Sequence, residues 1–62
     1  MKAEHIKIDF IPEAMPNQVV RFINGRYGVY DSERKQNMAY GMDKMQAAEW
    51  AHRRNYKHAW GV

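Results

Sequence analysis

Hydrophobic and polar residues alternate on both sides of an Asn-Gly pair over residues 18–30 (QVVRFINGRYGVY). Alternation with a period of two is typical of a half-buried β-strand, and Asn-Gly is the preferred pair for a two-residue type I′ turn. The pattern therefore predicts a β-hairpin with Val20 opposite Val29. One face is expected to be a core face: Val20, Phe22, Tyr27 and Val29. The other face is expected to be mixed, basic and aromatic: Val19, Arg21, Ile23, Arg26, Gly28 and Tyr30.

A third strand is expected over residues 36–42, after a polar turn formed by residues 31–35. An even-numbered loop would add three apolar residues to the core face: Met38, Tyr40 and Met42. An odd-numbered loop would place Asn37 and Ala39 there instead. The apolar pattern favours the even loop, because a slip of one residue would bury an asparagine.

The segment over residues 43–60 has the spacing of a helix. Asp43 and Gln46 stand as in a capping box, so the helix is expected to begin at residue 44. We expect it either to end near Asn55 or to continue until Gly61. One side carries small residues that allow close approach to the sheet: Ala47, Ala48 and Ala51.

The N-terminal region shows a shorter alternation. Residues 5–10 (HIKIDF) place Ile6, Ile8 and Phe10 on one face, which predicts a half-buried strand; the alternative is a loosely ordered terminal arm. Two prolines make residues 11–17 an extended connector. The chain thus predicts an α+β fold: a three-stranded antiparallel sheet, four-stranded if the N-terminal segment joins it, with one C-terminal helix packed across one face.

Sixty-two residues suffice for one small domain (1–62), with arm and connector over 1–17, antiparallel hairpins over 18–42 and helix with tail over 43–60. The composition, 45% hydrophobic and 27% charged, is that of a globular protein. There is no cysteine, hence no disulfide and no thiolate metal site. No stretch approaches the ~20 apolar residues of a membrane span, and the N-terminal alternation is unlike a signal peptide. We therefore expect a cytoplasmic protein.

Groups suited to catalysis are sparse. His52 and His58 are six residues apart, whereas helical zinc pairs are four apart, so no metal site is expected. There is no glycine-rich loop that opens a helix, and a fold this small lacks the volume of a typical substrate cleft. We therefore expect no enzymatic activity, no cofactor and no small-molecule substrate.

The formal net charge is +3, and the excess lies in residues 32–62. One basic surface is expected on the open sheet face and its neighbouring turn: Arg21, Arg26, Tyr30, Arg34 and Lys35. Arginines on a bare sheet can read guanine in a DNA major groove while turn residues hold phosphates. The alternative is that the N-terminal arm or a second subunit covers this face and the arginines are simply solvated.

A second basic surface is expected on the outer side of the helix: Trp50, Arg53, Arg54 and Lys57. An aromatic ring among cations suits phosphate or single-strand contacts, or an acidic protein partner. The alternative is that Trp50 flanks the core and the charges are solvated.

The segment RFINGRYGVYDSERKQNMAYGMDKMQAAEWAHRRN resembles the N-terminal arm-site DNA-binding domains of phage tyrosine integrases, and it is also similar to the plant ethylene-response type of DNA-binding domain. Both have three antiparallel strands, an aromatic after the first turn, an aspartate near the second and an alanine-rich helix. Over residues 18–55 the resemblance implies a phage or mobile-element protein of the host cytoplasm that binds DNA through the open sheet face. By position it implicates Arg21, Arg26, Tyr30 and the Arg34-Lys35 turn. The extra segment, residues 6–10, decides whether that face is open.

A protein-interaction module is the other functional class, either a host-enzyme inhibitor or a self-associating homodimer. Aromatic residues dominate such interfaces. The apolar anchors would be Ile23, Tyr30, Trp50, Tyr56 and Trp60. A third interpretation is a domain without a tight partner.

Overall fold

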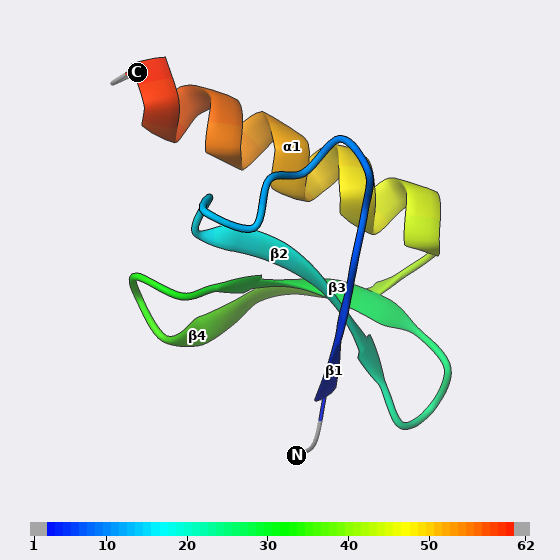
Figure 1. Ribbon diagram of the computed structural model, residues 1–62. Coiled ribbons are helices and arrows are strands. Elements are labelled where there is room, and N and C mark those ends of the chain that lie inside the picture. Colours follow the sequence, from blue (N-terminus) through cyan, green and yellow to red (C-terminus); the bar gives the residue numbers. More distant parts are fainter. Residues whose placement is uncertain (1–2, 61–62) are drawn as a thin grey trace.

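The computed structural model describes residues 3–60, with side chains over 3–56. Over these residues the chain forms an antiparallel sheet with strand order β1-β2-β3-β4, and one helix lies across one of its faces (Figure 1). The predicted α+β fold is confirmed, and the sheet has the fourth strand. The elements are β1 (Ala3–Ile6), β2 (Asn17–Phe22), β3 (Tyr27–Asp31), β4 (Gln36–Met42) and α1 (Lys44–Trp60).

The β2–β3 hairpin is present, but its loop has three residues instead of two. The Phe22 carbonyl accepts the Gly25 N–H at 2.9 Å, and the Phe22 N–H donates to the Arg26 carbonyl at 2.8 Å. Within this loop only Gly25 has a positive φ, +84°, whereas the Asn24 side-chain oxygen accepts the Arg26 N–H at 3.0 Å. A turn followed by one left-handed residue is the common three-residue hairpin loop. The predicted type I′ turn is therefore wrong.

The longer loop shifts the strand register by one residue. Val19, rather than Val20, pairs with Val29. Because side chains alternate between the faces of a sheet, this shift reverses the predicted faces of β2. Val19 now lies under the helix. The four residues expected to share a core face are divided, with Tyr27 and Val29 on the helix side and Val20 and Phe22 on the opposite side. That opposite side, which we call the outer face, carries His5, Gln18, Val20, Phe22, Gly28, Tyr30 and Tyr40.

β4 covers the predicted residues, but irregular pairing changes its faces. Register shifts occur on both sides of the pair formed by Val29 and Ala39. As a result, Ala39 and Met42 pack toward the helix, while Tyr40 lies on the outer face. The expectation that Met38, Tyr40 and Met42 share a core face is wrong, because bulges interrupt the alternation on which it was based.

The helix begins directly after Asp43, as the capping spacing predicts. The Gln46 side-chain oxygen accepts the Asp43 N–H at 3.1 Å, and the Ala47 N–H donates to the Asp43 carbonyl at 2.9 Å. The helix continues to Trp60, so the later of the two expected ends is confirmed. The predicted alanine stripe is buried against the sheet: Ala47, Ala48 and Ala51.

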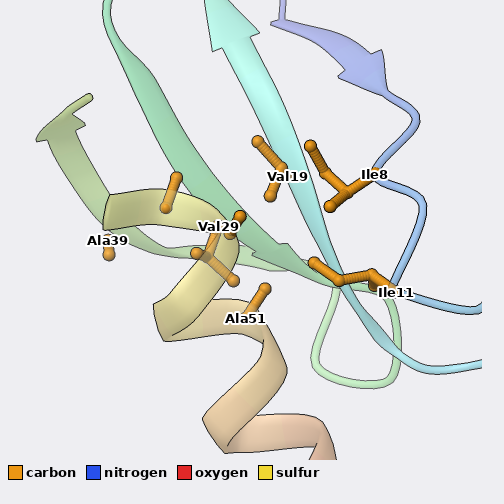
Figure 2. Close-up of a cluster of buried hydrophobic side chains, with 8 residues drawn as sticks. Ile8, Ile11, Val19, Val29, Ala39 and Ala51 are labelled. Atoms are coloured by element: carbon orange, nitrogen blue, oxygen red, sulfur yellow. The ribbon is translucent and has the colours of Figure 1, made fainter. Parts of the chain in front are cut away.

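The N-terminal strand ends at Ile6, earlier than the pattern predicts, and residues 7–16 cross from the sheet to the helix and return to β2 (Figure 1). Ile8 and Ile11 fill the space between helix and sheet beside the valines of β2 and β3 (Figure 2). Phe10, expected on the same face as Ile8, is exposed and turns its ring edge-on to a helix side chain. The connector therefore closes the helix side of the sheet rather than the outer face.

Candidate functional site

The residues predicted to bind DNA do not form one surface. Arg21 lies on the helix side of the sheet, because it pairs with Tyr27 across the β2–β3 ladder, and its guanidinium is 3.2 Å from the Glu4 carboxylate. Arg26 lies at the end of the hairpin, 3.6 Å from the Asp43 carboxylate. The expected arginine-lined sheet face is therefore wrong, since the register shift moves Arg21 to the other side.

Arg34 and Lys35 lie in the β3–β4 turn, at the end of β3 remote from the hairpin loop. Asp31 organises this turn, because its Oδ1 atom accepts the N–H groups of Glu33 at 2.9 Å and Arg34 at 3.2 Å. Lys35 adopts a left-handed φ of 56°. The Arg34 Nε atom is 4.0 Å from the second carboxylate oxygen of Asp31. The two cations thus remain on exposed side chains at this end of the strand.

The outer face is built around one aromatic ring laid over a glycine. A Cβ atom on Gly28 would stand 2.3 Å from the Ala39 carbonyl oxygen and 2.8 Å from the Phe22 ring. The absence of a side chain at Gly28 therefore allows β4 and the Phe22 ring to approach, and Phe22 is only 5% exposed. Glycine at a strand position is typical of such close approach.

Tyr40 stands beside this ring and is the most accessible tyrosine or phenylalanine of the outer face. Its ring centroid is 5.5 Å from that of Phe22, with the planes inclined by 35°. Tyr40 is nevertheless 61% exposed. The Tyr40 ring therefore contacts the Phe22 ring and stays largely exposed to solvent.

Tyr30 is the one predicted site residue that lies on the outer face. His5 of β1 meets the Tyr30 ring edge-on, with centroids 5.9 Å apart and planes at 72°. Between their strands, Val20 of β2 is 1% exposed. The two rings thus extend the aromatic surface across three strands.

Charge is distributed unevenly between the two faces. The described strands contain two carboxylates, those of Glu4 and Asp31, and both lie on the helix side. The outer face has none among the described strand residues. Exposed cations lie at the two ends of β3, at Arg26, whose guanidinium is near Asp43, and at the Arg34-Lys35 turn, where Arg34 is near Asp31 on the helix side. An anion approaching this face therefore meets rings in the middle and positive charge at either end.

The alternative basic surface on the helix is largely turned inward. Trp50 is half-buried against the core, and the Arg54 guanidinium lies 5.3 Å from the centre of its ring. Only Arg53 projects as an exposed cation on the described part of this surface. Lys57, the fourth residue of the prediction, has a side chain outside the described residues. The structure therefore supports the interpretation that Trp50 flanks the core.

A buried polar cluster joins the helix to the sheet, and the sequence reasoning missed it. The Asn55 side chain accepts the Asn17 N–H and donates to the Asn17 carbonyl, both at 2.9 Å. Arg54 donates to the Asn17 side-chain oxygen at 3.0 Å and lies 3.6 Å from the Asp31 carboxylate. Asn55 lies four residues after Ala51, so the helical period already places it on the alanine stripe. A polar residue facing the sheet requires such partners.

No family model, curated protein or solved structure matches the chain. In the described part of the chain, no helix is long and apolar enough to cross a membrane. Over the same residues, no group of three or more His, Cys, Asp or Glu is placed to hold a metal ion. The resemblance to integrase arm-site domains therefore stays a prediction, and function has to be inferred from surface chemistry.

Proposed function

We propose that this chain is a small, non-enzymatic cytoplasmic protein, of a phage or mobile-element type, that binds DNA through the outer face of its sheet. The proposal rests on the combination of an exposed aromatic ring on that face and flanking cations. An exposed Tyr40 ring stands on a strand surface without carboxylates, and cations lie at both ends of β3. Proteins that bind nucleic acids without strong sequence preference combine these two elements.

The cations at the two ends are accessible to phosphates. The Arg26 and Arg34 side chains are 60% and 63% exposed, although each is near a carboxylate. The Arg26–Asp43 pair is exposed on both sides, and such pairs contribute about 0–1 kcal/mol, so a phosphate can replace that carboxylate at little cost. The carboxylate near Arg34 is the buried one of Asp31, which keeps Arg54 at 3.6 Å when Arg34 turns to a phosphate. Each phosphate bound also releases counterions, which adds affinity at low salt.

The way in which DNA would be bound differs from the one implied by the resemblance. In the integrase-type domains that the segment resembles, the open sheet face reads the DNA major groove, which by position would implicate arginines of this chain. Here, Arg21 faces the helix side and is paired with Glu4. The resemblance supports DNA as the ligand class, while the geometry favours rings over arginines as the central contacts.

A titration of fluorescently labelled DNA at low salt tests the proposal. Removing Arg26 or Lys35 by alanine substitution should weaken binding and lower the slope of log K against log salt by about 1 each. Arg53→Ala on the helix is the matched control and should leave affinity unchanged. The absence of binding at low salt, or a loss with Arg53→Ala as large as with Arg26→Ala, would contradict the proposal.

A protein-interaction module is the second candidate, and one observation favours it. Ile23, at the tip of the β2–β3 hairpin, is 89% exposed, so nearly all of its aliphatic side chain is accessible to a partner. If the chain self-associates through this tip, sedimentation should show a mass that increases with concentration. Ile23→Ser should then abolish the increase. A constant monomer mass in the unmodified protein would dismiss self-association.

A further inference from the structure

We infer that the nucleic acid bound at the outer face is single-stranded, with its bases stacked on Tyr40 and Tyr30. This inference rests on the proposed function and specifies its ligand. Single strands of DNA and RNA share the required chemistry, namely base surfaces that are free to stack and a flexible chain of phosphates.

The Tyr40 ring is presented in a way that suits stacking with an unpaired base. Its centroid lies 5.5 Å from that of the Phe22 ring, and Phe22 is itself fixed because it is buried over Gly28. A ring that contacts a fixed neighbour and is 61% exposed can receive a base without prior rearrangement. Such a platform favours unpaired bases, because the bases of a duplex are already stacked on one another.

Among the described strand residues, no lysine or arginine points from the outer face. Arg21 is the single lysine or arginine in the described strands, and it points to the helix side, where it pairs with Glu4. The Gln18 amide, on the outer face, donates to the Pro12 and Met15 carbonyls, both at 2.8 Å. The central part of the outer face therefore offers rings to a ligand, and it lacks the arginine or lysine that makes the commonest specific contact with guanine in a major groove.

The exposed cations lie at the two ends of β3. Arg26 precedes β3 and the Arg34-Lys35 turn follows it, so the positive charges lie at opposite ends of this strand. At about 3.3 Å per residue, β3 separates them by on the order of 20 Å. A single strand laid along β3 would place bases on the Tyr30 and Tyr40 rings and phosphates at both ends. Because any base can stack, we expect little sequence preference.

The test compares three labelled ligands of one sequence, each about 12 nucleotides long. They are single-stranded DNA, single-stranded RNA and the DNA duplex, titrated by fluorescence anisotropy at low salt. We expect at least one single strand to bind about tenfold or more tightly than the duplex. The preferred strand identifies DNA or RNA as the ligand.

Substitutions of Tyr40 and, as a control, of the exposed helix residue Tyr56 complete the test. Tyr40→Ala should weaken single-strand binding roughly fivefold or more, whereas Tyr40→Phe, which keeps the ring, should retain most of it. Tyr56→Ala removes an exposed tyrosine on the helix and should leave the affinity for the single strand unchanged. Circular dichroism and thermal melting establish that each variant is folded.

Two results would overturn the inference. One is a duplex affinity equal to or greater than that of both single strands; salt-dependent duplex binding of this kind would leave the proposed function intact. The other is unchanged single-strand binding in the folded Tyr40→Ala variant. No binding to any of the three ligands would overturn the inference and the proposed function together.

Discussion

The two faces of the sheet are covered by different means. On the helix side, small residues such as Val19 and Val29 lie beneath a stripe of alanines, so a separate element covers the strands. On the outer face, the sheet covers itself: the Phe22 ring lies over Gly28 and is only 5% exposed. A single buried aromatic ring therefore covers the centre of the outer face, whereas a helix covers the opposite face.

This difference explains why the site lies where it does. Where the helix covers the sheet, side chains such as those of Val19 and Val29 are enclosed and cannot contact a ligand. A face covered by one ring is closed at its centre and open at its margin, where Tyr40 rests on Phe22 and stays exposed. The covering ring and the proposed binding platform are therefore neighbours.

The largest effect is expected from Gly28→Ala, which breaks the outer face. A Cβ atom there would meet backbone and ring atoms, so β4 or Phe22 has to move. We expect a loss of about 3 kcal/mol in the free energy of unfolding, measured with urea. Gly41→Ala is the control: φ is +69° and no atom lies within 4 Å, so about 1 kcal/mol of backbone strain is expected. Equal losses would show that the outer face is not closely packed over Gly28.

The next effect is expected on the helix side. Asn55→Ala removes two hydrogen bonds and leaves the buried N–H and C=O of Asn17 without their partner. We expect a loss of about 2–3 kcal/mol. Asn24→Ala removes one exposed hydrogen bond in the hairpin loop and should lose no more than about 1 kcal/mol. Thermal unfolding of both variants provides the comparison, and similar melting temperatures would argue against the Asn17–Asn55 link.

Tyr40→Ala should have a smaller effect on stability than either. It removes a partly exposed ring and its contact with Phe22, so about 1 kcal/mol is expected. Its effect on single-strand binding should exceed its effect on folding. A loss of stability as large as that of Gly28→Ala would mean that Tyr40 belongs to the core rather than to a binding platform.

Arg21→Ala should have the smallest effect. The ion pair with Glu4 is exposed on both sides, and such pairs contribute about 0–1 kcal/mol. Because Arg21 lies on the helix side, DNA affinity should also be unchanged. A drop in affinity comparable to that of Arg26→Ala would place Arg21 in the site and contradict the assignment of faces.

The elements could be predicted from the sequence, but their faces could not. Alternation and capping located β4 and the start of the helix, because both signals depend on residues next to each other in the chain. The register of the hairpin depended on whether Asn24 and Gly25 both take a positive φ, as in a type I′ turn, or Gly25 alone does, as observed. With valine at both 19 and 20, the apolar pattern fits either register.

This ambiguity in register affected the prediction of the candidate site more than the prediction of the elements. A shift of one residue moved Arg21 away from the outer face and left Tyr30 as the one member of the predicted set on it. Tyr40 was missed as a site residue, because the bulges in β4 turn it outward and no local pattern announces them. The polar link from Asn55 to Asn17 joins residues far apart in sequence, which periodicity alone cannot pair.

An NMR titration tests most directly whether the ligand binds the outer face while the helix covers the opposite face. Single-stranded DNA is added to ¹⁵N-labelled protein, and amide shifts are followed residue by residue. The account predicts shifts at His5, Tyr30 and Tyr40, with smaller ones at Arg26 and Lys35, and unchanged amides at Gln46 and Arg53 of the helix. Shifts that cluster on the helix while the outer face stays unchanged would contradict it.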